Sequence, residues 1–210
     1  MIRTLLAGSA VLALTSGAAM ADYSITILHT NDFHDRFEPI SRFDSGCSEE
    51  DNAAGECFGG MARMVTAIEA AKTRTNNFIL VDGGDQFQGT LFYQYYKGQT
   101  AAEFMNGVGY DAMAVGNHEF DDGPEALEEF AKLADFPVLM SNADLSGEPG
   151  LDAVIQKSVV LEKGGERIGL IGLTPINNDE LASPGPNITC LLYTSPSPRD
   201  QRGSRMPSSA

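Results

Sequence analysis

Three short segments of this chain carry side chains of the kinds that bind divalent metal ions. The first holds Asp32 and His34, the second holds Asp85, and the third holds Asn117 and His118. Carboxylate, imidazole and amide groups are ligands that several divalent transition metals accept. Each segment follows an apolar run, at residues 25–28, 78–81 and 112–115. Because the carboxyl ends of parallel strands meet at one edge of a sheet, these residues are predicted to form a two-metal hydrolase site.

Each segment also has an ordinary structural explanation when it is taken alone. A surface pair would explain Asp32 and His34, and a turn would explain the sequence Gly-Gly-Asp at residues 83–85. A hydrogen-bonded loop would explain Gly-Asn-His-Glu at residues 116–119. The order of the three segments, each after an apolar run and separated by helical patterns, favours the metal site over these explanations.

Apolar patterns predict short strands that alternate with helices. Strands are expected at residues 24–28, 77–81, 111–115 and 136–141. Helices are expected at residues 60–72, in two pieces across 88–107, and from Asp122 onward, where a capping residue and an early proline open a helix. Residues 154–161 and 167–173 are predicted to form a hairpin, and residues 30–58 a long polar loop. The alternation indicates an α/β fold.

Composition excludes some classes of partner. The chain has 210 residues, 14 basic and 29 acidic side chains, and a net charge of −15. Such a charge argues against binding to a nucleic-acid polymer or to an anionic membrane, since phosphates would be repelled. The hydrophobic fraction of 42% is enough for a sizeable core.

The amino terminus has the pattern of a secretory signal peptide. Arg3 precedes an apolar stretch at residues 5–14, and small residues lead to a predicted cleavage after Ala21. An uncleaved membrane anchor is the alternative, but the apolar stretch is too short to span a bilayer. The sequence therefore predicts a periplasmic or secreted protein that begins at Asp22, with residues 1–21 removed.

The cysteines fit an oxidising compartment. Cys47 and Cys57 enclose a polar loop and are predicted to form a disulfide, whereas a thiolate metal site would need closer spacing and more ligands. Cys190 is left over, and it lies in a basic, low-complexity tail at residues 183–210. The tail is either disordered or, as we prefer, foreign sequence from about residue 189 onward, which would also account for Cys190.

Three motifs resemble those of the calcineurin-like metallophosphoesterases. They are the sequences HTNDFH at residues 29–34, GGDQFQGT at 83–90 and GNHEFD at 116–121. Their longer forms, with CFGGMAR at residues 57–63, resemble the secreted 5′-nucleotidase and 2′,3′-cyclic phosphodiesterase branch. The resemblance covers roughly residues 23–175. It implies a two-sheet α/β sandwich flanked by helices, with the metal ions at one rim.

The resemblance also implies a role for each motif residue. The metal-binding positions would be Asp32, His34, Asp85 and Asn117. Asp85 would bridge two divalent ions of the zinc, manganese or cobalt type. His118, oriented by Asp121, would contact the phosphoryl group or the leaving oxygen of a nucleotide or other phosphoester. Hydroxide bridging the two ions would attack phosphorus and release phosphate.

The chain also departs from the family pattern. The family carries two further histidine motifs downstream, whereas the histidines here are His29, His34 and His118, and His29 is interpreted as structural. The family also carries a C-terminal domain with an aromatic nucleoside clamp. We therefore expect residues 22–182 to form a partial domain, incomplete at its C-terminus, of a weakly active or inactive truncated chain. The alternatives are a thiosulfohydrolase-like metallohydrolase and a non-catalytic secreted binding fragment.

Overall fold

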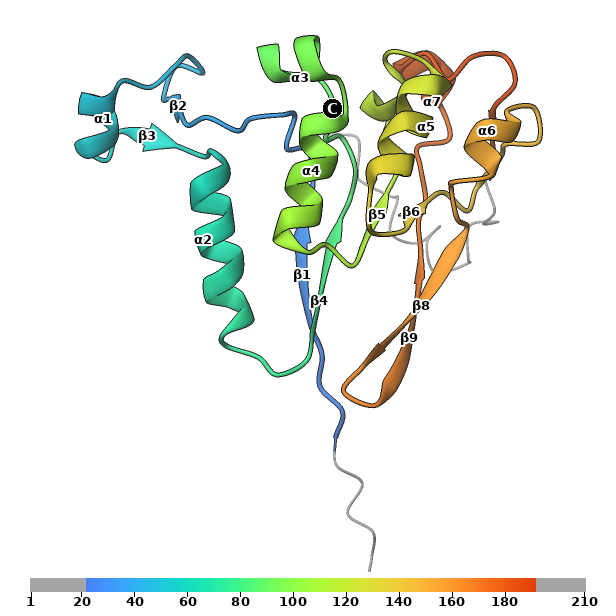
Figure 1. Cartoon of the computed structure of the whole chain (residues 1–210), viewed down its shortest axis with the longest axis horizontal. Coiled ribbons are helices and arrows are strands. Elements are labelled where there is room, and N and C mark those ends of the chain that lie inside the picture. Colours follow the sequence, from blue (N-terminus) through green and yellow to red (C-terminus); the bar gives the residue numbers. More distant parts are fainter. Residues whose placement is uncertain (1–21, 192–210) are drawn as a thin grey trace, which may run out of the picture.

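A four-stranded parallel sheet forms the centre of the molecule in the computed structural model, which describes residues 22–191 (Figure 1). Its strands, in spatial order, are β1 (Thr26–Thr30), β4 (Phe78–Asp82), β5 (Ala112–Ala114) and β6 (Val138–Leu139). In the register of β1 on β4, Thr30 lies opposite Asp82. All the pairings are parallel, so the loops that follow β1, β4 and β5 leave the sheet at the same edge.

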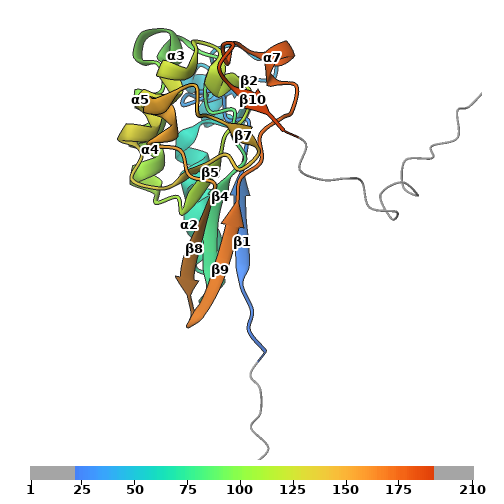
Figure 2. The same cartoon turned by 90° about the vertical axis from the view of Figure 1, so that its right-hand side faces the viewer.

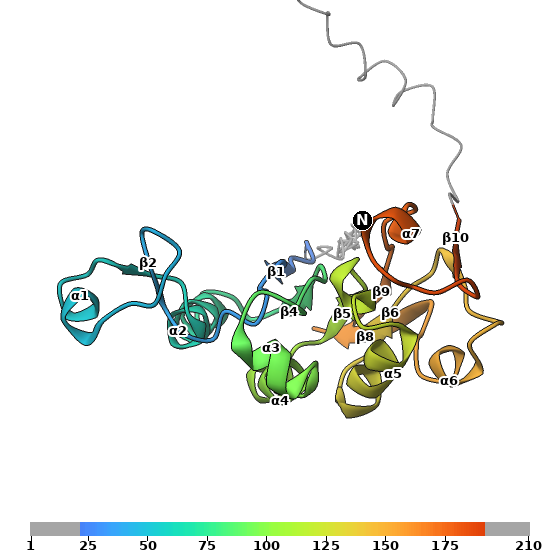
Figure 3. The same cartoon turned by 90° about the horizontal axis from the view of Figure 1, so that it is seen from above.

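Helices cover one face of this sheet (Figure 3). They are α3 (Leu91–Tyr96), α4 (Gln99–Val108), α5 (Pro124–Leu133) and the short α6 (Pro149–Asp152), whereas α2 (Met61–Lys72) lies beside β1 at the edge of the sheet. The buried cluster beneath them joins Leu80 and Met113 of the strands to Met105, Leu127 and Phe130 of the helices. Burial of this apolar surface is the main term that fixes the helices on the sheet.

Local sequence explains where these helices begin and end. Pro124 occupies the first turn of α5, where the missing N–H costs nothing. Gly109 closes α4 in the left-handed conformation, with φ of 81°. The predicted division of residues 88–107 into two helical pieces is confirmed, because α3 ends at Tyr96 and α4 begins at Gln99.

The predicted hairpin is present as β8 (Ser158–Lys163) and β9 (Glu166–Ile171), which pair antiparallel. Figure 1 shows it on the side of β4 away from β1, below β5 and β6, and Figure 2 shows that it extends in the same direction as β1 and β4. Two contacts fix its turn near the amino ends of the central strands. The Tyr23 hydroxyl donates to the Lys163 carbonyl at 2.8 Å, and the Lys163 ammonium binds Asp111 at 2.7 Å. The hairpin thus braces the edge of the sheet opposite the ligand-bearing loops.

The segment between β1 and α2 is more ordered than the predicted loop. It contains β2 (Ile40–Ser41), α1 (Glu49–Ala53) and β3 (Cys57–Phe58), and β2 pairs with β3. Ser48 caps α1 by accepting from the Asp51 amide. The predicted disulfide joins Cys47 and Cys57, whose Cα atoms are 6.0 Å apart. Figures 1 and 3 show this disulfide-bonded excursion projecting beyond α2, away from the sheet.

The remaining elements are short. They are the 3₁₀ helix η1 (His118–Phe120), β7 (Ala143–Asp144), α7 (Asn178–Leu181) and β10 (Thr189–Cys190), which pairs with β7. The predicted signal peptide and residues 192–210 of the predicted tail lie outside the described residues. Among residues 22–191, no helix is both long and apolar enough to cross a membrane. The predicted α/β class is confirmed, with one parallel sheet and a separate hairpin in this part of the chain.

Candidate metal centre

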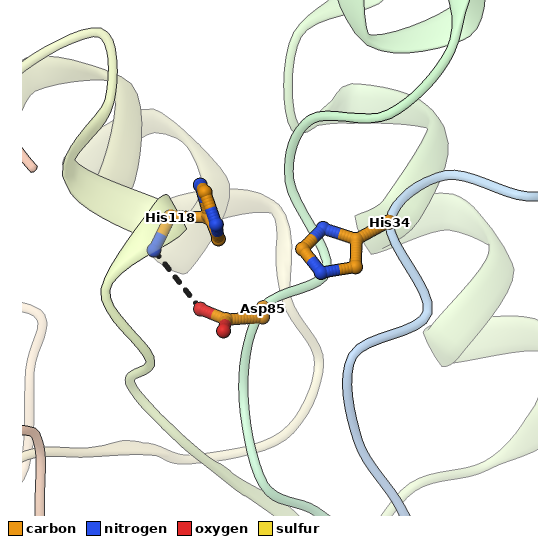
Figure 4. Close-up of side chains that lie close together, drawn as sticks. All are labelled: His34, Asp85 and His118. Carbon is orange, nitrogen blue, oxygen red and sulfur yellow. Dashed lines mark hydrogen bonds between the residues drawn. The ribbon is translucent and has the colours of Figure 1, made fainter. Parts of the chain in front are cut away.

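His34, Asp85 and His118 lie together at the carboxyl edge of the sheet (Figure 4). Each offers one potential ligand atom, and these atoms all lie within 4.8 Å of one another. The two imidazole rings meet edge to face, with centroids 5.0 Å apart. The three residues come from the loops after β1, β4 and β5, so the topology brings together positions that are far apart in the sequence.

The loop after β4 places Asp85 by a close approach of two backbones. A Cβ on Gly84 would lie 2.3 Å from the Gly116 nitrogen, and a Cβ on Gly116 would lie 2.3 Å from Asp85 Oδ1. Only glycine fits at either position. Gly84 also has φ of 100°, which disfavours any other residue. The two glycines therefore let the second and third loops touch where Asp85 presents its carboxylate.

His118 contacts the carboxylates of Asp85 and Asp121 through different atoms. Its backbone N–H donates to Asp85 Oδ1 at 2.9 Å, drawn as the dashed line in Figure 4. Its Nδ1 donates to Asp121 Oδ2 at 2.6 Å, which leaves Nε2 free. Burial lowers the pKa of His118, but the hydrogen bond and charge of Asp121 raise it more, and Asp85 and Glu119 add to the rise. The net pKa lies above the usual value.

The loop after β1 carries Asp32 and His34. It continues the β1–β4 ladder, since the Asp32 amide donates to the Gly84 carbonyl at 2.9 Å and the His34 amide to the Asp85 carbonyl at 3.1 Å. The Nδ1 of His34 faces the Phe87 carbonyl at 2.9 Å. A carbonyl only accepts, so Nδ1 carries the proton, and Nε2 is the nitrogen whose lone pair is available to a metal ion.

Asp32 is the more exposed member of this loop. Its Oδ1 lies 3.9 Å from His34 Nε2, and 56% of its side chain is exposed. Asp32 and His34 both have positive φ, 53° and 52°. Asp and His adopt this region more readily than most residues, and such backbone gathers at functional sites.

Asn117 immediately precedes His118, at the N-cap position of η1, and its side chain makes no capping hydrogen bond there. The structure thus groups His34, Asp85 and His118, sets Asp32 beside His34, and joins Asp121 to His118. His118, which the resemblance assigns to substrate, lies in the candidate ligand group itself.

Sequence reasoning missed two buried carboxylates beneath these loops. Asp82 accepts from the Thr30 hydroxyl at 2.5 Å, the Gly84 amide at 2.8 Å and the Gln86 side chain at 2.9 Å. Burial raises the pKa of Asp82 to about 6, although these hydrogen bonds lower it. Glu119 is fully buried. The available signal was an acid at the end of an apolar run and another next to His118.

The donor set fits a divalent transition metal. Two imidazoles and one carboxylate within 4.8 Å combine ligands that zinc, manganese and cobalt accept. The Nδ1 protons of both imidazoles have protein acceptors, a carbonyl for His34 and a carboxylate for His118. Such contacts fix the ring and the tautomer of a metal-binding histidine.

Comparison with known proteins gives a consistent family. The sequence model of the calcineurin-like phosphoesterases matches residues 25–198. A 5′-nucleotidase of Diplobatis ommata is 43% identical over 171 residues, which cover 80% of this chain and 29% of that protein. A snake venom 5′-nucleotidase of Gloydius brevicauda is 38% identical over 185 residues, covering 87% of this chain and 31% of that protein.

A solved structure gives the same picture. The crystal structure of a 5′-nucleotidase precursor from Thermus thermophilus superposes with a TM-score of 0.70 at 40% identity. The alignment covers 80% of this chain and 32% of that one. The chain thus spans about three-tenths of the length of the relatives that it matches.

Proposed function

This chain belongs to the calcineurin-like phosphoesterase family. We propose that it contains metal-binding residues of the catalytic domain of an exported hydrolase, and that this hydrolase releases phosphate from nucleotides. Members of this family are metal-dependent phosphoesterases. The observation that carries the proposal is the convergence of His34, Asp85 and His118 within 4.8 Å at the carboxyl edge of the sheet. The relatives named 5′-nucleotidases, at 43% and 38% identity, indicate the substrate class.

The metal ions would be held by the four positions proposed from the sequence, Asp32, His34, Asp85 and Asn117. Two divalent ions bound there would supply positive charge that binds a phosphate group and stabilises the charge developing on it. The protein itself would contribute the fixed orientation of these ligands. His34 is oriented by the Phe87 carbonyl, and Asp85 by the His118 amide.

His118 and Asp121 would handle the leaving group. Asp121 accepts from Nδ1 of His118, so the ring presents Nε2 to the site. Because Asp121 raises the pKa of His118 above its usual value, the imidazole holds its second proton at a higher pH than a free histidine. A protonated Nε2 would donate to the departing oxygen of the phosphoester.

Export is supported by the signal-peptide pattern of residues 1–21 and by the disulfide between Cys47 and Cys57. One of the matched relatives is named as a snake venom protein, and venom is a secreted fluid. We therefore propose a periplasmic or secreted location.

A metal and substrate assay tests the function. Purified protein is stripped with a chelator, and the binding of Mn²⁺, Zn²⁺ and Co²⁺ is then measured by equilibrium dialysis. The loaded protein is offered AMP, a 2′,3′-cyclic nucleotide and a generic aryl phosphate. We expect metal binding, weak phosphate release from AMP and weak ring opening of the cyclic nucleotide, and both activities should stop when the metal is removed.

The other outcomes separate the alternatives. Sulfate release from an S-thiosulfonate, without phosphate release, would identify the thiosulfohydrolase-like activity. Bound metal with no product from any substrate would favour a non-catalytic binding fragment. Metal binding no greater than that of an Asp85→Ala variant would overturn the proposed metal centre.

A further inference from the structure

Glu119 is fully buried, yet its carboxylate is surrounded by backbone N–H donors. Oε1 accepts from the Gln86 amide at 2.8 Å and from the Phe87 amide at 3.4 Å; Oε2 accepts from the Asp85 amide at 3.0 Å and from the Gly116 amide at 2.8 Å. The side chain has 0% exposure. Four donors on two oxygens satisfy a buried carboxylate about as fully as a protein can.

These donors belong to both loops that meet at the metal centre. Asp85, Gln86 and Phe87 lie in the loop after β4, whereas Gly116 lies in the loop after β5. Glu119 lies in η1, next to His118. A single carboxylate therefore ties the second loop to the third.

Asp85 is held from two directions by adjacent residues. Glu119 accepts from its backbone amide, and the amide of His118 donates to its side-chain oxygen. The carboxylate of Asp85 is consequently held against the backbone of His118. Neither contact uses the atoms with which His118 faces the site.

We propose that Glu119 is a positioning residue that sets the distance between the loops of Asp85 and His118, and through it the affinity of the metal centre. The proposal rests on the metal-binding role of Asp85 proposed above. Glu119 itself is not a ligand, since both of its oxygens are occupied by backbone amides. Its role is to fix the geometry that the ligands require.

The chemistry of the four donors makes the proposal specific. Backbone N–H groups cannot reverse their polarity, so both oxygens of residue 119 must accept. Glutamine has the same shape but would turn an NH₂ group toward two N–H donors. That substitution loses hydrogen bonds and leaves buried donors without acceptors. A side chain that only fills space would be replaced by glutamine without effect.

The experiment compares Glu119→Gln and Glu119→Asp with the exposed control Glu103→Gln on α4. For each variant, Mn²⁺ and Zn²⁺ affinity is measured by equilibrium dialysis, and folding is measured by circular dichroism. We expect Glu119→Gln to weaken metal affinity by about 10–100-fold. Glu119→Asp keeps a carboxylate and should lose less, while Glu103→Gln should match the wild type. Metal affinity of Glu119→Gln within twofold of the wild type would overturn the proposal.

A second measurement needs neither metal nor a variant. In the chelated wild-type protein, the amides of Asp85, Gln86 and Gly116 should exchange with solvent more slowly than amides of exposed loops, because a buried carboxylate binds them. Rapid exchange at these amides would overturn the proposal even if Glu119→Gln failed to fold. If the wild type bound no metal but these amides were protected, the proposed function would fail while the tie between the loops would stand.

Discussion

The two sides of the candidate metal centre are built in different ways. On one side, the loops after β4 and β5 are joined by Glu119 and by the packing of Gly84 against Gly116. On the other side, the loop after β1 has positive φ at Asp32, His34 and Asp35 and leaves Asp32 more than half exposed. The first side is fixed by buried hydrogen bonds, and the second by a few backbone contacts.

The difference between the two sides shows which contacts fix the positions of the ligand side chains. Asp85 and His118 are linked directly, since the backbone amide of His118 donates to the carboxylate of Asp85. Within the described part of the chain, Asp32 is oriented by the carbonyl of Gly84 and by the neighbouring side chains of Asn31 and His34. Water can reach the position of an exposed carboxylate. A water molecule can therefore replace the Asp32 carboxylate as a ligand more easily than it can replace a buried ligand.

The largest effect is expected from Asp85→Asn. The substitution removes a negative charge from the fixed side, where nothing else can replace it. We expect metal affinity to fall by at least about 100-fold, more than for loss of a group that only supports a ligand, with phosphohydrolase activity lost in parallel. Asp32→Asn on the exposed side should cost about tenfold. Metal content after dialysis measures both, and an equal loss from the two variants would contradict the comparison.

His118→Ala tests which role His118 has on the fixed side. If His118 faces the leaving oxygen, its replacement by alanine should lower turnover by at least about tenfold with the metal still bound. Loss of metal in this variant would instead make His118 a ligand, as its place beside His34 and Asp85 permits. Unchanged turnover would remove it from the mechanism.

Asp121→Asn supplies the matched control. It removes the charge that raises the pKa of His118 but leaves the imidazole in place. The alkaline limb of the pH–rate profile should therefore move to lower pH, with metal content unchanged. A profile that stays in place would show that His118 does not titrate in the reaction.

The sequence predicted the strands well because their apolar runs are short and clearly bounded. Its errors lie at the polar ends. The first strand was expected at residues 24–28 but extends from Thr26 to Thr30, because Thr30 binds Asp82 across the ladder. The second strand, expected at residues 77–81, likewise extends to Asp82, which makes this contact. Hydrogen bonds between segments so far apart along the chain are not visible in a local pattern.

In the candidate site, too, the sequence indicated local features but not contacts between distant segments. The sequence could identify four site residues because their side chains are of types that commonly bind metal ions: Asp32, His34, Asp85 and His118. The support beneath them could not be named, because the GNHEFD motif contains Glu119 but does not show that its side chain is buried. The ordered excursion around α1 was missed for a related reason, since polar residues at 30–58 gave no periodic signal.

Asp35 links the exposed side to the stability of the fold. Its carboxylate is buried, and its two oxygens have no hydrogen-bond partner among residues 22–191. Burial, together with the charge of Glu119, raises the pKa of Asp35 from 3.8 to about 7. Between pH 4 and 7 the folded chain binds more protons than the unfolded chain, so the free energy of unfolding should fall as pH rises.

Chemical denaturation in chelator at about pH 5 and pH 8 checks this dependence. Asp35→Asn removes the charge and keeps a residue that tolerates positive φ. It should stabilise the metal-free protein by about 1–3 kcal/mol at the higher pH and have a smaller effect at the lower one. The exposed Asp152→Asn should change neither value. A metal-free protein that becomes more stable from pH 5 to 8 would contradict the assigned titration.

The smallest effect on the metal centre is expected from removal of the disulfide. Cys47→Ser combined with Cys57→Ser opens a short loop, which costs about 2–3 kcal/mol in the chain-entropy description. At the base of the excursion the Met61 amide donates to the Phe37 carbonyl at 2.9 Å, so the junction with residues 31–37 stays closed. Metal affinity should therefore remain within twofold of the wild type while the melting temperature falls. A parallel loss of metal would mean that the segment containing β2, α1 and β3 holds the loop after β1 in place. Among the described residues, the loops after β4 and β5 make no hydrogen bond to that segment, so they could not transmit the effect.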